Sequence, residues 1–228
     1  MRIAVGAVYL LYPRRTMRAA FICCIAASLA AVCARAQEWE VGGAGGFGAY
    51  KNATVTSPTG SATVGFDDRF AVGAVLGQDL YEHLSGEIRY TYRDNDLLLS
   101  RGAQKVNMDG DTHSVHYDLL FHPTRKGSRV RPFAALGGGA RVFRGTGKEY
   151  VDQPLGGLAL LTKTSDLKAL ISIGGGVKVS ISNHAIIRVD FRDYLSPFPM
   201  KLFVTSPGSR IHGWLQDFVP LAGVSFVF

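Results

Sequence analysis

Histidine, serine and aspartate residues lie close together between residues 113 and 122, where they could support acyl transfer. That chemistry needs a serine nucleophile, a histidine base and a carboxylate that orients the histidine. His113 and Ser114 are neighbours, so an extended strand would send their side chains to opposite faces. His116 and Asp118 share a face, but no serine lies beside them in this register. We therefore expect ordinary strand residues here, and not an enzyme.

Two other patterns that could hold a ligand are weak. His116 and His122 share a strand face, yet about 20 Å of extended chain separates them, which is too far for one metal ion. Residues 43–48 match the glycine-rich dinucleotide fingerprint, but these glycines alternate along a strand and no βαβ unit follows. We expect neither a metal nor a cofactor.

The elements that would position these side chains are clearest between Leu167 and Tyr194. Alternate residues from Leu167 to Ile181 are apolar, and most of their neighbours are small, polar or cationic. The alternation resumes after a short turn at 182–184. A period of two in consecutive runs indicates a β-hairpin, and the glycines at 174–176 argue against a helix. Strands of about 10 to 12 residues are long enough to cross a membrane.

The same alternation predicts eight strands, over residues 38–50, 69–77, 84–93, 114–122, 129–143, 167–181, 185–194 and 214–228. The connections after the first, third, fifth and seventh strands are long (51–68, 94–113, 144–166 and 196–213), and the others are short. An even strand number with long loops at one end is typical of bacterial transmembrane barrels. The predicted fold class is therefore all-β, an eight-stranded antiparallel up-and-down transmembrane β-barrel. A soluble barrel with exchanged faces shows the same alternation.

A leader precedes the strands. Arg14, Arg15 and Arg18 precede an apolar run, and Ala34 and Ala36 supply a small-x-small cleavage site. We predict a cleavable signal peptide over residues 1–36, with Met17 as a possible true start, and a barrel over 37–228. An uncleaved membrane anchor and a lipid-modified Cys33 are the alternatives.

Charge and cysteine usage both belong to this leader. Five of the 25 basic residues are arginines before residue 37, which leaves 20 basic against 18 acidic residues. The net charge of +7 is therefore mostly a property of the leader, and we expect no nucleic-acid partner. All three cysteines also lie before residue 37, so the mature chain would form no disulfide.

Charged residues gather on the face predicted to point inward. They are Glu38, Glu40, Glu87, Asp118, Asp190 and Asp217 with Arg69, Arg89, Arg93, Arg129, Arg131, Arg141, Lys168, Lys178, Arg188 and Arg192. Unpaired charge is costly to bury, so a narrow lumen must pair or hydrate these groups. The favoured reading is a network that plugs the barrel; the alternative is a gate in a narrow pore. The candidates for either role are Glu40, Arg69, Glu87, Arg89, Asp118, Arg131, Arg141, Lys178, Arg188 and Asp190.

Three segments resemble a known family. Residues 222–228 resemble the β-signal of bacterial outer-membrane proteins, with alternating Val224, Phe226 and terminal Phe228. Residues 84–92 and 131–139 are similar to the third and fifth strands of small OmpA-type and OmpX-type barrel domains. Since the chain stops at Phe228, we expect no peptidoglycan-binding domain after the barrel.

The resemblance implies an outer-membrane protein with both termini in the periplasm. Its expected partners are outer-membrane lipids and lipopolysaccharide, with the barrel assembly machinery and periplasmic chaperones during biogenesis. The expected role is structural or surface interaction. The alternatives are a narrow anion-leaning channel and a soluble periplasmic ligand-binding barrel. Apolar residues in the long loops, namely Tyr150, Leu158–Leu161, Phe198 and Phe203, suit partner binding, although no loop ligand can be named.

Overall fold

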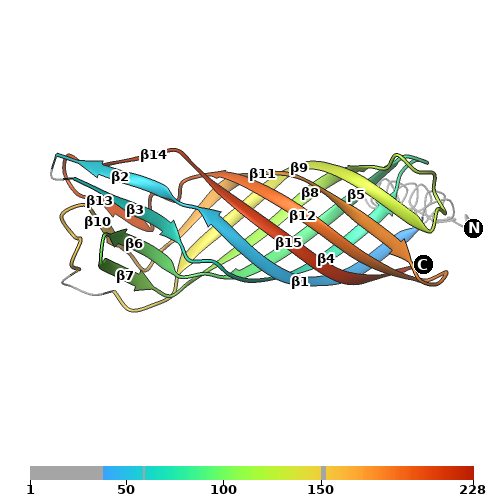
Figure 1. The fold of residues 1–228 in the computed structure, drawn as a ribbon, viewed down its shortest axis with the longest axis horizontal. Coiled ribbons are helices and arrows are strands. Elements are labelled where there is room, and N and C mark those ends of the chain that lie inside the picture. The colour runs from blue at the N-terminus through green and yellow to red at the C-terminus, as the bar shows by residue number, and fades with distance from the viewer. Residues whose placement is uncertain (1–37, 59, 150–152) are drawn as a thin grey trace, which may run out of the picture. The chain divides into compact units, whose positions relative to one another are not determined.

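The computed structural model describes residues 38–58, 60–149 and 153–228, and within these residues no helix is long and apolar enough to cross a membrane. Eight antiparallel strands form a closed barrel in which each strand pairs with its neighbours in sequence and the last pairs with the first (Figure 1). They are β1 (Trp39–Lys51), β4 (Arg69–Asp79), β5 (Leu84–Asp94), β8 (Gly110–Phe121), β9 (Val130–Gly145), β11 (Ser165–Ser180), β12 (Ala185–Pro197) and β15 (Trp214–Val227). The predicted eight-stranded up-and-down barrel is confirmed.

The outer face of the barrel is apolar. Val189 is 56% exposed and Leu136 is 61% exposed, whereas the side chains next to Val189, Arg188 and Asp190, are buried. The same alternation holds on β8, where Val115 is 52% exposed. In a soluble barrel these apolar side chains would fill the interior, so the soluble alternative does not fit. An exposed apolar belt around a closed barrel is what a lipid bilayer requires.

Four long connections extend from one end of the barrel, and they carry seven short strands (Figure 1). The sequence predicted these segments only as loops. A five-stranded sheet has the order β14-β2-β3-β6-β7, and β10 pairs with β13. The strands are β2 (Ala53–Ser57), β3 (Gly60–Phe66), β6 (Leu97–Arg101), β7 (Gln104–Met108), β10 (Ala159–Leu161), β13 (Phe203–Thr205) and β14 (Arg210–His212). We call the described residues of these connections the head, and the opposite end of the barrel the turn end.

The head has an apolar core of its own. Val55, Val64 and Leu99 are fully buried in it, and Phe66 stacks on the barrel residue Phe143 with ring centroids 5.2 Å apart. The short strands fold because each packs apolar side chains of one face against this core. The core also contains further apolar residues of the long connections, namely Leu158, Leu161, Phe198 and Phe203. The expectation that these four bind a partner is therefore wrong, because they are internal; Leu160 of the same run is exposed, and Tyr150 lies outside the described residues.

Candidate functional site

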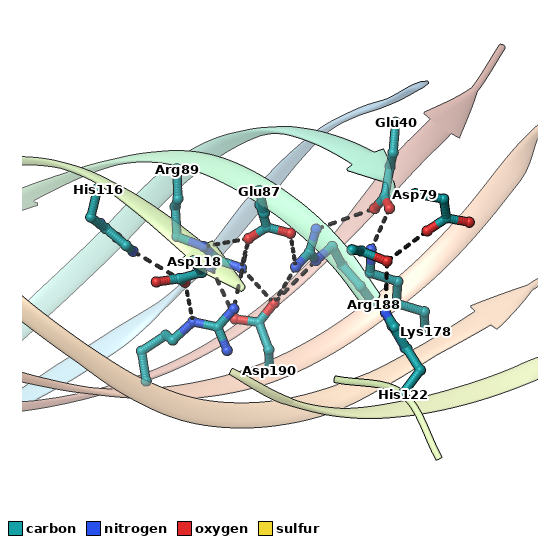
Figure 2. Close-up of polar contacts among 12 residues, drawn as sticks. Glu40, Asp79, Glu87, Arg89, His116, Asp118, His122, Lys178, Arg188 and Asp190 are labelled. Atoms are coloured by element: carbon teal, nitrogen blue, oxygen red, sulfur yellow. Dashed lines mark hydrogen bonds and ion pairs between the residues drawn. The ribbon is translucent and has the colours of Figure 1, made fainter. Parts of the chain in front are cut away.

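The lumen of the barrel is filled by a network of buried ion pairs (Figure 2). At its centre the Arg89 guanidinium donates to both carboxylate oxygens of Asp190, at 3.0 Å each, and to Glu87 Oε1 at 2.7 Å. Arg188 donates to the other oxygen of Glu87 at 2.8 Å and to Asp190 Oδ2. Two arginines on β5 and β12 thus share two carboxylates, and bidentate geometry of this kind gives strong, directional pairs.

The network continues along the lumen in both directions. Towards the turn end, Arg188 Nη1 donates to Glu40 Oε1 at 3.2 Å, and the other oxygen of Glu40 accepts from Lys178. Towards the head, Arg192 Nε donates to Asp118 Oδ2 at 3.1 Å, and His116 Nε2 lies 3.5 Å from the same oxygen (Figure 2). Five of the eight barrel strands, β1, β5, β8, β11 and β12, supply these groups, so the network spans the middle of the lumen.

A second cluster lies nearer the head. Asp217 accepts from Arg141 Nη2 at 2.7 Å and also pairs with Arg93. Arg93 packs over the Tyr50 ring at 4.1 Å and donates to the carbonyl oxygen of Gly48 at 2.7 Å. These contacts join β1, β5, β9 and β15 at the level where the barrel meets the head.

Glycines make room for these long side chains. A Cβ atom placed on Gly137 would collide with the Asp118 carboxylate, and one placed on Gly48 would collide with the Arg93 guanidinium. The small residues that alternate on the inner face therefore have a definite packing role. At Gly137 and Gly48 a charged side chain occupies this space, whereas at Gly42 and Gly46 it is occupied by Ser225 and by the backbone of Pro220.

A cavity of about 320 Å³, which Arg131 and Ser85 help to line, lies at the turn end of the lumen. Arg131 Nη1 donates to Asp79 Oδ2 at 3.0 Å, and Ser85 Oγ donates to Asp79 Oδ1 at 2.6 Å. His122 Nε2 lies 3.0 Å from Ser85 Oγ. Burial, together with the positive charges of Arg131 and Lys178, lowers the pKa of His122 to about 4.

This serine–histidine contact was missed because Ser85 and His122 are distant in sequence and only the pairing of β5 with β8 joins them. Its geometry differs from that of a hydrolytic triad. The carboxylate of Asp79 contacts the serine, whereas His122 Nδ1 faces the carbonyl oxygen of Pro132 at 3.2 Å. Among residues 38–58, 60–149 and 153–228, no carboxylate accepts a hydrogen bond from the His122 imidazole, whereas a triad needs a carboxylate in that position.

Comparison with known proteins agrees with this geometry. The model of the family described as "Outer membrane protein beta-barrel domain" matches residues 24–197. The chain belongs to the outer membrane β-barrel family. No curated protein sequence matches it significantly.

Among solved structures, the barrel is similar to the outer membrane protein OprG from Pseudomonas aeruginosa, with 11% identity and a TM-score of 0.55 over 83% of this chain and 95% of that one. It is also similar to Neisserial surface protein A, with 12% identity and a TM-score of 0.46 over 84% and 97% of the two chains. At these identities the likeness concerns the fold. The family membership and the barrel together make this an integral protein of the bacterial outer membrane, in contact with membrane lipid.

Most of the predicted lumen candidates of this outer membrane barrel lie together. Seven belong to the central network: Glu40, Glu87, Arg89, Asp118, Lys178, Arg188 and Asp190. Arg141 lies in the second cluster, and Arg131 lies at the turn-end cavity. Arg69 lies apart from them at the rim of the head, where it pairs with Asp94 and Asp96 and its side chain is 42% exposed.

Three further residues belong to the lumen clusters, and the candidates for the assembly signal and the cleavage site lie outside the lumen. Arg93, Arg192 and Asp217 complete the two clusters, and their inward position was the signal that could have added them. Val224 and Phe226 face outward on β15, and Phe228 follows it. Ala34 and Ala36 lie outside the described residues. Among the residues that the structure describes, no group of three potential metal ligands occurs.

Proposed function

We propose that this barrel is a closed structural and surface-contact protein of the outer membrane, not a channel. The observation that carries the proposal is the central network, in which Arg89, Arg188 and Asp190 have fully buried side chains. A conducting pore needs hydrated groups that an ion can approach and leave. Charges that are paired with each other in a narrow lumen favour a plug.

One feature favours the channel as the second candidate. The central network and the second cluster together contain six basic residues and five acidic ones, whereas Asp166, buried near the head end of β11, is paired with Lys168 of the same strand. A cationic excess would favour anions in a pore that opens.

Conductance in planar bilayers separates the two functions. We expect the purified native barrel to be silent and the double variant Glu87→Ala/Arg188→Ala to conduct, because it removes the middle of the plug. Arg125→Ala, at the exposed turn end, is the matched control and should be silent. Discrete anion-selective steps from the native barrel would contradict the closed state and support the channel.

We also propose that the head faces outward and both termini lie in the periplasm. Long connections at one end and tight turns at the other support this orientation, since outer-membrane barrels have short periplasmic turns and longer extracellular loops. All cysteines lie in residues 1–36, so single cysteines can report topology. A cysteine at Thr56 in the head should react with an impermeant maleimide on intact cells, and one at Ser128 should react only after lysis. The reverse pattern would contradict the orientation.

Assembly by the barrel assembly machinery, with periplasmic chaperones, completes the proposal. The alternating apolar end formed by Val224, Phe226 and Phe228 supports a β-signal, and lipopolysaccharide would be the neighbour of the head. Deleting Phe228 should lower the amount of folded protein in the outer membrane, whereas Thr56→Ala at an exposed position of the head should not. Equal amounts of both variants would count against the signal.

A further inference from the structure

The wall of the barrel opens into a pocket where it meets the head. The strand pairs separate here, because β1 ends at Lys51 opposite Gln216, and β2 pairs with β14 at Thr54 and His212. Gly213, between β14 and β15, has φ +107°, a conformation that glycine adopts readily. The result is a pocket of about 450 Å³ on the outside of the molecule, whose lining includes Lys51, Leu195, His212, Trp214 and Gln216.

The level of this pocket is set by the apolar belt below it. On the outer face of β12 and β15, Phe191 pairs with Pro220, and the next outward pair is Asp193 with Phe218. One pair further towards the head, Leu195, Gln216 and Lys51 form a row across three strands. Polar side chains therefore begin directly above the belt, as expected where acyl chains give way to headgroups.

The pocket combines an aromatic platform with positive charge. Trp214 is 57% exposed, and tryptophan is favoured at the membrane–water interface. Lys51 and His212 are exposed, and among residues 38–58, 60–149 and 153–228 no carboxylate lies within ion-pair distance of either. The nearest acidic group along the row below, Asp193, accepts from Gln216 Nε2 at 2.7 Å and does not line the pocket.

We propose that this pocket binds the phosphate-bearing headgroup of an outer-leaflet lipid. Lys51 would pair with the phosphate, His212 would donate a hydrogen bond to it, and Trp214 would pack against the adjoining polar group. A lipid fits better than a free anion, because the pocket begins where the apolar belt ends and the acyl chains of a bound lipid could continue along Phe218 and Pro220. The inference rests on the proposed surface-contact role and names its partner.

Trp214 can report on binding, because the chain has two tryptophans and the other, Trp39, starts β1 at the opposite end of the barrel. The Trp39→Phe protein would be inserted into phosphatidylcholine vesicles with increasing phosphatidylglycerol of the same acyl chains. We expect a Trp214 emission shift that saturates at a low fraction of the anionic lipid and weakens at high salt. In the Trp214→Phe protein, Trp39 should show no such saturation.

Substitutions locate the site. Lys51→Gln should raise the half-saturating lipid fraction about fivefold, as expected for one cation near an anionic headgroup, and Lys51→Arg should restore binding. Lys201→Gln removes the same charge from another exposed lysine of the head end and should have no effect. Thermal mobility shifts on gels would show that each variant is folded.

Three results would overturn the proposal: Lys51→Gln that binds like the native chain, Lys201→Gln that weakens binding equally, or inorganic phosphate that produces the same shift as the lipid. Both leaflets of these vesicles contain the same lipid, so the outcome does not depend on which way the head faces. A failure of the proposed orientation or of the closed lumen is therefore distinguishable from a failure of this site.

Discussion

The barrel and the head bury opposite kinds of side chain, although both consist of strands with two alternating faces. In the barrel, Arg188 and Asp190 are internal and Val189 is exposed. In the head, Val55 and Val64 are internal and Thr54 and Thr63 are exposed. The difference follows from the solvent, since lipid accepts the apolar face of one region and water accepts the polar face of the other. The same sequence period therefore produces an ionic interior in one region and an apolar interior in the other.

The largest effect should come from removing one member of the ionic interior. Glu87→Gln leaves Arg89 and Arg188 with too little negative charge around them. Breaking a buried ion pair from one side costs up to about 5 kcal/mol, so the free energy of unfolding should fall by that order. Urea titration of the protein in lipid vesicles, followed by gel mobility, measures it. A loss below about 1 kcal/mol would mean that water replaces the missing charge and that the lumen is not dry.

A substitution in the apolar interior of the head should destabilise the head and leave the barrel intact. Phe66→Ala removes a ring that stacks on Phe143 and contacts Phe203 edge-on at 5.6 Å between centroids. Cavities of this size cost about 3 to 4 kcal/mol. Hydrogen exchange should accelerate in residues 53–66 and 97–108 and stay unchanged in β11 and β12. Equal acceleration in both regions would show that head and barrel unfold as one unit.

The free energy of unfolding should depend on pH through His122, which lies at the turn end of the lumen. The folded-state pKa of His122 is lowered to about 4 by burial, below the ordinary value of about 6.5. The unfolded chain therefore binds a proton first, and stability falls as the pH decreases from about 6.5 to about 4, by on the order of 2 kcal/mol. Unfolding at pH 7, 5 and 4 should show this loss in the native chain and a smaller loss in His122→Gln. Parallel curves would contradict it.

The smallest effect should come from an ion pair outside the interior. Arg125 lies 3.5 Å from Glu82, and the two side chains are 82% and 57% exposed. Exposed pairs contribute less than about 1 kcal/mol. Arg125→Gln should change the free energy of unfolding by less than about 0.5 kcal/mol in the assay used for Glu87→Gln. A larger change would mean that solvent exposure does not explain why the Arg125–Glu82 pair contributes less than the buried ion pairs of Glu87.

The barrel was predictable from sequence because one simple rule, alternation, applies to every strand. From Leu167 to Tyr194 the rule assigns both the strands and their faces, and the structure confirms them. Strand ends were less certain: β8 begins at Gly110 and not at Ser114, since pairing with β9 continues towards the head.

The head was missed although it carries the same signal. Val55 and Val64 alternate with threonines, and Leu97 and Leu99 precede a turn at Gly102, whose φ is +57°. These runs are only three to seven residues long, and a short run in a long loop does not reveal its partner. The partners of the ion pairs could not be predicted from the sequence either. The contact of Arg89 with Asp190, 101 residues away, depends on how far the strands are staggered around the barrel.

The fit between glycines and charged side chains has a consequence for how such a lumen can evolve. The Arg93 guanidinium occupies the space that a side chain at Gly48 would need, whereas at Gly137 the backbone of Tyr117 and Asp118 fills that space together with the Asp118 carboxylate. Enlarging Gly48 alone creates a collision with Arg93, and shortening Arg93 alone removes one of the two cations that pair with Asp217. Related sequences should therefore change these two positions in correlated steps, and such paired changes would reveal which residues meet inside the lumen even where their strands do not pair.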